Sequence, residues 1–273
     1  LKETYSAAQA EESPIKITAE YDPAPAVERI KSFVAHYNKV IDYINNELSE
    51  EQFRDYDPLT ESQKEEMSDK EIELWEEKAK SGLLRNDRIL QGIVNELRRA
   101  LTDLVDEAGL TLSSIGITSG SYTDRGKLQV NESKLKEALL NNRDKVEKLF
   151  IAKSDISYSP DLSLEERTQR YRQSGLMHRV SDILNDYIRT TRNKNGNKGI
   201  LLEKAGISGD TTEYKNTLSN EIKRIEERIT RAVQQLNSKE EAYWKKFTVM
   251  EKAIQQMNSQ SSWLTAQLGL GNG

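Results

Sequence analysis

Residues 213–268 read EYKNTLSNEIKRIEERITRAVQQLNSKEEAYWKKFTVMEKAIQQMNSQSSWLTAQL, and this stretch decides the fold class of the chain. Its apolar residues recur at alternating steps of four and three, which is the heptad spacing of a coiled coil. One extra four-residue step, from Tyr243 to Phe247, shifts the phase as a stutter does. A straight helix of this length would extend about 84 Å at roughly 1.5 Å per residue. We therefore expect one long helix that pairs with another long helix, in this chain or in another.

The apolar stripe of this helix is the candidate interaction surface. Met250 and Met257 give it an adaptable apolar character. Trp244 and Trp263 are large aromatics on a thin helix, and either partner contact or packing within the chain would explain them. The predicted partner or oligomer interface comprises Leu218, Ile222, Ile225, Ile229, Leu236, Tyr243, Phe247, Met250, Ile254, Met257, Trp263, Leu264 and Leu268.

The composition indicates thin cores. Of the 273 residues, 36% are hydrophobic and 31% are charged, whereas about 45–50% apolar residues is usual for a globular domain. We therefore expect an elongated, helix-rich shape. Together with the heptad stripe and one predicted hairpin, this gives a mainly α fold with a small β-hairpin (α+β), an elongated helical bundle that ends in a long coiled-coil helix. The formal net charge of −5 argues against an extended nucleic-acid-binding surface, which needs a basic excess.

Helical periodicity and caps place the elements of the first half. Alternating apolar residues predict a strand over 15–21, and Asp22 is a predicted N-cap. A helix over 25–50 then carries Val27, Ile30, Val34, Tyr37, Ile41, Ile44 and Leu48 on one face. Residues 51–68 have a loop composition. Ser68 and Glu71 form a capping-box pair before a short helix with Trp75, and a second helix is expected over 87–107, with Leu104 inward.

A hairpin and further helices are expected in the second half. Apolar pairs at 115–117 and 128–130 flank a Gly-rich and Ser-rich turn, which predicts a β-hairpin. Asn131 should cap the helix that follows. Ser163 and Glu166 form another capping box, which should open one helix reaching about residue 192. The inward face of that helix should comprise Tyr171, Met177, Val180, Leu184, Tyr187 and Ile188.

No constellation of side chains indicates catalysis. The chain has no cysteine and only two histidines, His36 and His178, which excludes thiolate and His-rich metal sites. No phosphate-loop motif occurs, and adjacent acidic residues on a helix point about 100° apart, so they cannot form a dyad. We therefore expect no enzyme, no cofactor and no metal. No apolar run is long enough to span a membrane. Leu1 opens no signal peptide. Because the sequence also lacks an initiator Met, we expect a fragment or a processed product.

Four blocks of sequence resemble a known family. They are VERIKSFVAHYNKVIDYIN at 27–45, RDYDPLTESQKEEMSDKEIELWEEKAKSGLLRND at 54–87, IGITSGSYTDRGKLQVNESKLKEAL at 115–139 and FTVMEKAIQQMNSQSSWLTAQL at 247–268. In this order they are similar to the C-terminal half of the bacterial flagellar filament cap protein family, FliD, also called the second flagellar hook-associated protein. The second block resembles the Gram-positive type.

This resemblance implies a domain order and a set of partners. Residues 1–22 would end a β-rich plate domain, 23–217 would form a mixed helical leg domain with its hairpin near 115–130, and 218–273 would form the coiled-coil terminal helix. It implies a ring-like homo-oligomer at the distal tip of the bacterial flagellum, outside the cell, which retains exported flagellin and promotes filament elongation and motility. Before export by the type III flagellar apparatus, a cytoplasmic chaperone would cover the C-terminal helices. No nucleic acid and no membrane insertion are implied.

Two other functions remain open from the residues alone. A generic coiled-coil stalk or adhesin would also need an unpaired heptad stripe, and a role in cell adhesion at the filament tip is compatible with capping. The resemblance implies that N-terminal helices pair with the terminal helix. Because those helices are not in this sequence, we expect part of the stripe over 218–268 to self-associate or to be less ordered.

Overall fold

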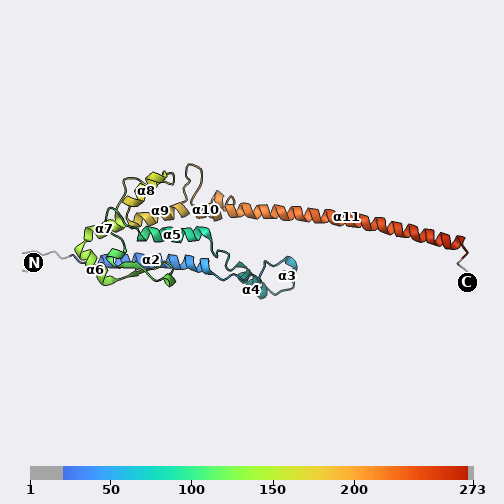
Figure 1. The fold of residues 1–273 in the computed structure, drawn as a ribbon, viewed down its shortest axis with the longest axis horizontal. Helices are drawn as coiled ribbons and strands as arrows, with labels where there is room; N and C mark the ends of the chain where they lie inside the picture. The colour runs from blue at the N-terminus through green and yellow to red at the C-terminus, as the bar shows by residue number, and fades with distance from the viewer. Residues whose placement is uncertain (1–20, 270–273) are drawn as a thin grey trace, which may run out of the picture. The chain divides into compact units, whose positions relative to one another are not determined.

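The computed structural model describes residues 21–269, so the strand expected over 15–21 and the plate segment 1–22 lie almost wholly outside the described residues. By its contacts the chain divides into two compact units, one up to Ile200 and one from Leu201. The first unit is a helical body with one hairpin, and the second is dominated by one long helix (Figure 1). A mainly α fold with a small hairpin and a long C-terminal helix is thus confirmed.

Helix α2 (Ala24–Ser49) forms the centre of the first unit. Its buried face is the predicted one: Val27, Ile30, Val34, Tyr37, Ile41 and Ile44. Leu48 is only half-buried. The N-cap is Pro23 rather than Asp22. Asp22 still contributes, because its Oδ1 accepts a hydrogen bond from the backbone N–H of Ala24 at 2.9 Å. Proline is suited to this position because the first N–H groups of a helix have no helical partner.

The hairpin is held against α2 by polar side chains. Strands β1 (Ile117–Ser119) and β2 (Leu128–Val130) pair antiparallel, as predicted, with Ile117 opposite Val130. The Asn38 amide pairs with both backbone groups of Leu128: its Nδ2 donates to the carbonyl, and its Oδ1 accepts from the N–H, each at 2.8 Å. The Tyr37 hydroxyl donates to the carbonyl of Gly126 at 3.1 Å. Asn38 therefore serves as a one-residue third strand beside β2.

A small helical element follows α2. The sequence predicts a loop over 51–68, but Thr60 and Gln63 form a capping box that opens helix α3 (Glu61–Glu65). Helix α4 (Asp69–Lys80) has the predicted box, since the Glu71 carboxylate accepts from the N–H and the hydroxyl of Ser68. Gly82 has φ +67, as a helix C′ residue requires. Trp75 packs on Tyr56, with ring centroids 4.6 Å apart.

Helix α5 (Arg88–Thr102) lies between α2 and α9 (Figure 1). Asp87 caps it by accepting from the N–H groups of Ile89 and Leu90. The prediction that this helix reaches residue 107 is wrong. The chain leaves the helix after Thr102, and Val105 forms a bridge with Leu110 around a turn at Gly109. Leu104, which the periodicity places inward, is consequently 50% exposed.

Two short helices, α6 and α7, follow the hairpin and pack against α2 and α9. Helix α6 (Glu132–Asn141) begins at the predicted cap, Asn131, whose side chain accepts from the N–H of Lys134. It buries Leu135 and Leu139 and contacts α2 and α7. Helix α7 (Arg143–Ile151) buries Val146, Leu149 and Phe150, as expected, and contacts α9.

The single helix expected over 163–192 is broken in two. Helix α8 (Leu164–Gln173) begins at the predicted capping box of Ser163 and Glu166, and helix α9 (Leu176–Ile188) follows after a break at Gly175. The N–H of Gly175 donates to the carbonyl of Ala152 at 2.9 Å. A Cβ at Gly175 would approach the backbone at the end of α7 to 2.7 Å. This close approach of two backbones requires glycine and turns the chain.

The break changes which face of α9 is covered. Leu176, Arg179 and Tyr187 are buried, whereas Leu184 and Ile188, which the sequence places inward, are exposed. Met177 and Val180 are half-buried. The inward face is therefore shifted around the helix and includes one arginine.

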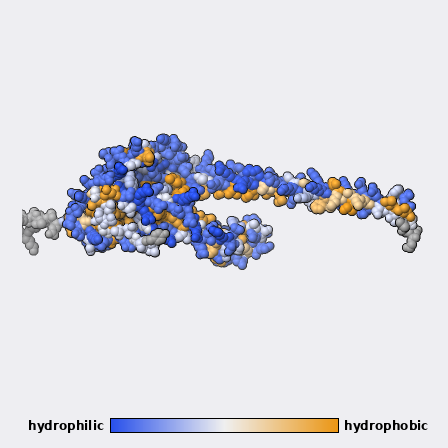
Figure 2. Space-filling model, in the orientation of Figure 1, coloured by the Kyte–Doolittle hydropathy of each residue, from blue (hydrophilic) through white to orange (hydrophobic). Residues whose placement is uncertain are grey.

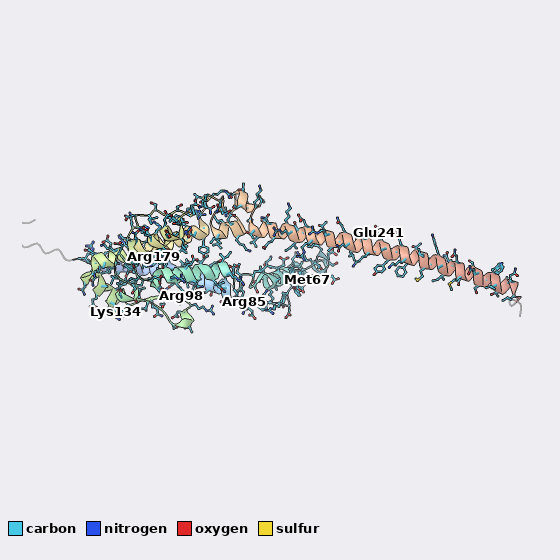
Figure 3. The ribbon with its side chains drawn as sticks, turned by 45° about the horizontal axis from the view of Figure 1, so that its top comes forward. Met67, Arg85, Arg98, Lys134, Arg179 and Glu241 are labelled. Carbon is cyan, nitrogen blue, oxygen red and sulfur yellow. The ribbon has the colours of Figure 1, made fainter. Side chains whose placement is uncertain are left out.

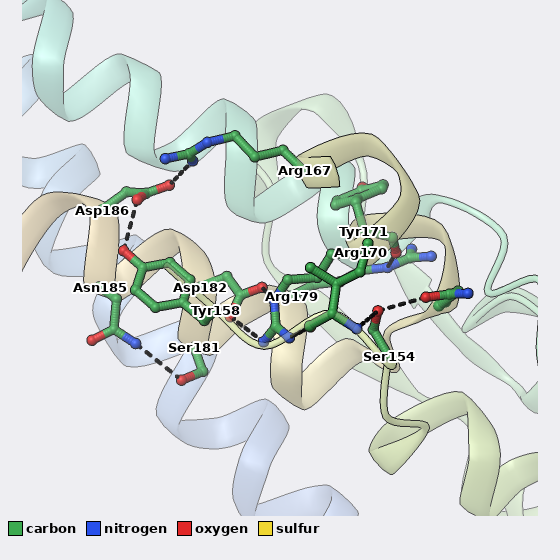
Figure 4. Close-up of polar contacts among 12 residues, drawn as sticks. Ser154, Tyr158, Arg167, Arg170, Tyr171, Arg179, Ser181, Asp182, Asn185 and Asp186 are labelled. Carbon is green, nitrogen blue, oxygen red and sulfur yellow. Dashed lines mark hydrogen bonds and ion pairs between the residues drawn. The ribbon is translucent and has the colours of Figure 1, made fainter. Parts of the chain in front are cut away.

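Arginine side chains join α8 and α9 to the rest of the unit (Figure 4). Arg179, only 1% exposed, donates from Nη2 to the carbonyl of Leu104 and from Nε to that of Tyr171. Its guanidinium lies 4.2 Å from the centre of the Tyr171 ring. Burial raises the pKa of Tyr171 to about 12. Arg170 and Asp182 pair through two N–H···O bonds, the shorter at 2.6 Å between Nε and Oδ2. Buried polar groups of this kind need every partner to be present.

The boundary between the units falls at the start of α10 (Ile200–Ala205), and the second unit continues with a short 3₁₀ turn, η3 (Thr211–Glu213). Asn216 then caps helix α11 (Thr217–Gln267) by accepting from the N–H of Ser219 at 2.8 Å. The long helix expected over 213–268 is confirmed, with its start moved to Thr217. We expect α11 to be about 76 Å long, at roughly 1.5 Å per residue.

We predict that Asn38→Ala destabilises the first unit by about 2–3 kcal/mol, because two backbone groups of Leu128 lose their partner. Urea-unfolding midpoints measured by circular dichroism check this. Asn46→Ala on the exposed side of the same helix is the matched control and should change stability by less than about 0.5 kcal/mol. Equal effects of the two variants would contradict the role assigned to Asn38.

A second prediction concerns alkaline stability. Burial raises the pKa of Tyr37 to about 12, from an ordinary value of 10.0. The unfolded chain therefore ionises at this residue before the folded chain does, and its contribution to stability is full below pH 10.0 and is lost as the pH rises toward 12. Tyr37→Phe should be about 1 kcal/mol less stable at pH 8 but should lose less stability between pH 8 and pH 11. Tyr43→Phe, at a 69% exposed position, should keep the parent slope in the same urea titrations.

Candidate interaction surface on helix α11

The apolar stripe of α11 is uncovered along its whole length. No residue of the helix is buried, and the thirteen predicted interface residues are between 42% and 67% exposed. Figure 2 shows hydrophobic patches along this helix. Completing the burial of a half-exposed Ile or Leu contributes about 1 kcal/mol, so a partner that covers several of them gains substantial free energy.

The structure also shows which residues the sequence reasoning missed or misplaced on this surface. Val233, 50% exposed, follows Ile229 by four residues and precedes Leu236 by three, so it belongs to the stripe by the same spacing. Trp263 is adjacent to Leu264 and therefore points about 100° away from it. It widens the apolar surface at the C-terminal end to a second face. Trp244, 72% exposed, lies beside the stripe at Tyr243.

Charge divides α11 into two segments. Residues 217–252 carry many acidic and basic side chains, including the pair Arg231 and Glu227 and a Lys246 ammonium 5.6 Å from the Tyr243 ring centre. Residues 253–268 carry no Asp, Glu, Lys or Arg. Covering a charged helix on every side is costly because charges lose their hydration. The uncharged segment can be enclosed at lower cost than the segment before it.

The two histidines and their neighbours have ordinary local contacts in the structure. His36 is exposed, with Nδ1 2.7 Å from the carbonyl of Ser32. Asp182 pairs with Arg170, not with the neighbouring His178. Between residues 21 and 269, no three His, Cys, Asp or Glu side chains are grouped so that they could hold a metal ion. Within that same range, no helix is both long and apolar enough to cross a membrane.

These features define a class of protein: a mainly α chain with one small hairpin, whose last helix presents an uncovered heptad stripe. The family model described as "Flagellar hook-associated protein 2 C-terminus" matches residues 4–259. The chain therefore belongs to the flagellar hook-associated protein 2 family.

Two curated relatives carry the name "Flagellar hook-associated protein 2". The protein from Halalkalibacterium halodurans is 36% identical over 242 residues, which cover 86% of this chain and 43% of the relative. The protein from Thermotoga maritima is 28% identical over 261 residues, covering 93% of this chain and 35% of the relative. The chain thus spans less than half the length of these two relatives.

One solved structure is also similar, the "flagellar cap protein FliD D1-D2-D3 domains from Escherichia coli". It is 22% identical to this chain, covers 61% of this chain and 33% of its own, and gives a TM-score of 0.37.

Because α11 buries no apolar side chain, we predict fast hydrogen exchange along 218–268 in a dilute monomer, compared with α2 and α5. Mass-spectrometric exchange at low and high protein concentration measures this. Protection should rise with concentration if the stripe associates with other copies. Strong protection of the stripe in the dilute monomer would contradict the prediction.

Proposed function

We propose that this protein acts as a filament cap at the distal tip of the bacterial flagellum, outside the cell. In this role it forms a ring-like homo-oligomer that retains exported flagellin and promotes its polymerisation, so that the filament elongates. The observation that carries the proposal is the family match over residues 4–259. The two relatives named flagellar hook-associated protein 2 support the same proposal.

The uncovered stripe of α11 supports a mechanical role. A cap holds its place by contacts alone, and a half-exposed stripe that runs along most of α11 supplies apolar area for other copies of the chain and for flagellin. The uncharged segment 253–268 is suited to being enclosed by several neighbours. We propose no catalytic step and no cofactor, since shape and binding free energy suffice for retention.

The domain roles follow from this proposal. Residues 23–217 would form the helical leg domain and 218–273 the terminal coiled-coil helix, with the plate formed by other parts of the protein. Before export, a flagellar chaperone would cover the C-terminal helices, which keeps the stripe of α11 from associating early. A chain without cysteine can pass unfolded through the type III flagellar export apparatus without disulfides to reduce.

One other function is favoured by a specific feature. A long helix with an exposed heptad stripe also fits a coiled-coil stalk or an adhesin without a capping role. Such a protein would bind along a filament or to a cell surface, whereas a cap binds only at one filament end. Adhesion at the tip could accompany capping.

Electron microscopy of flagellar filaments stripped of their caps tests the proposal. The gold-labelled 273-residue chain is added to these filaments, and label is counted at the ends and along the sides. Label at one end only is the expected result. Label along the sides would favour the stalk or adhesin, and no label on any filament would contradict the cap assignment.

For a variant test we predict that Leu264→Asp lowers end labelling at least about tenfold, because a charge on the stripe must be desolvated on docking. Ser238→Asp adds the same charge in the charged segment 217–252, two residues after Leu236 and about 200° around the helix from it, and should label nearly as the parent does. Circular dichroism should show equal helix content for both variants. A loss of helicity in the first unit would mean that Leu264 acts on folding instead.

A further inference from the structure

A polar cleft lies in the first unit, where α2, α5 and the hairpin turn meet. Its volume is about 740 Å³, within the range of ligand-binding clefts. Arg98 from α5 and Arg125 from the turn both line it, and none of its described lining residues is Asp or Glu. Figure 3 labels Arg98 on α5. These two guanidinium groups make the cleft locally basic in a chain whose formal net charge is −5.

The turn is shaped so that both arginines reach the cleft. Gly126 has φ +98, and a Cβ there would come within 2.8 Å of the Arg98 Cδ, so glycine leaves room for the arginine stem. Arg125 itself has φ +48, a left-handed conformation that a non-glycine residue adopts at a cost. Its carbonyl accepts from Asn45 Nδ2 at 3.0 Å, and its Nη1 donates to Ser49 Oγ at 2.8 Å. These two bonds hold the strained residue in place.

Much of the hydrogen-bonding capacity of the exposed side chains that line the cleft is not taken up by other groups of the described chain. A guanidinium has five N–H donors. Arg125 has one side-chain hydrogen bond, and within residues 21–269 the Arg98 side chain has no hydrogen bond or ion pair. The side-chain amides of Gln91 and Asn95 also line the cleft with no hydrogen bond to the rest of the described chain. The nearby acid of the turn, Asp124, is engaged with the N–H of Ser121 at 2.7 Å.

We propose that this cleft binds an acidic peptide segment of a partner protein. The two guanidinium groups would pair with carboxylates, which they can grip through two N–H···O bonds each. The amides of Asn45, Gln91 and Asn95 both donate and accept, which matches the N–H and C=O groups of a peptide backbone. A phosphate ion would fill only a small part of the volume. Leu48 and Val94 line the same cleft and give an apolar contact for one side chain of the peptide.

This site is independent of the capping proposal, because it involves neither α11 nor its stripe. Isothermal titration of the 273-residue chain with the capped peptide acetyl-Asp-Glu-Leu-Asp-Glu-amide tests it directly. The neutral peptide acetyl-Asn-Gln-Leu-Asn-Gln-amide is the matched ligand control. We expect binding of the acidic peptide that weakens as salt is raised, and at least about tenfold weaker binding of the neutral one.

Protein variants assign the binding to this cleft. Arg98→Gln should weaken binding of the acidic peptide about tenfold. Arg125→Gly should do the same while relieving the left-handed strain, so the fold is retained or stabilised. Arg85→Gln removes an exposed arginine that does not line the cleft and should bind as the parent does.

Three results would overturn the proposal. The first is that the acidic peptide does not bind the folded parent chain. The second is that Arg98→Gln and Arg125→Gly bind the peptide as tightly as the parent does. The third is that inorganic phosphate binds as tightly as the peptide. The last result would mean that the cleft is a simple anion site.

Discussion

The first unit depends on the contacts of helix α2. Its apolar face buries the side chains around Ile41, and α5, α6 and the hairpin all pack against it. Apolar burial alone does not fix where a three-residue strand lies along such a helix. The amide of Asn38 does, because its two bonds to Leu128 are made in only one register. The same turn then carries Arg125 and Gly126 to the mouth of the polar cleft, so the candidate peptide site follows from this contact.

Elsewhere in the first unit, hydrogen bonds and ion pairs of buried side chains connect helices that share only a thin apolar core. Arg179 fills a buried position on α9 and donates to the carbonyl of Leu104, just beyond the end of α5. It also donates, at 3.5 Å, to the carbonyl of Ala100 in the last turn of α5, where C=O groups have no partner within the helix. Arg170 and Asp182 join α8 to α9 in the same way. Such joints add little net stability compared with apolar packing. They do specify one arrangement, which suits a chain with only 36% hydrophobic residues.

Helix α11 differs from the first unit, because its apolar side chains are exposed. Its apolar residues are regular and numerous, yet none is buried within the described chain. The exposed stripe stabilises an assembly only when a partner covers it, because burying apolar surface lowers the free energy. The family match and the stripe together therefore support a role in assembly. The arginine cleft provides a second and chemically different contact, based on charge, on the other unit of the chain.

Local signals in the sequence determined most of the elements. Heptad spacing predicted α11, three-and-four spacing predicted α2, and the capping pairs at Ser68 and Ser163 marked two helix starts, because a cap or a periodic face involves residues only a few positions apart. The four sequence blocks likewise indicated the family. Only the tertiary structure decided the break at Gly175 and the burial of Arg179. The first depends on the backbone of α7, and the second on a carbonyl 75 residues away. The cleft also depends on tertiary contacts. Arg98 and Arg125 line one cleft only when the hairpin packs on α2 and α5, and no local sequence pattern predicts that packing.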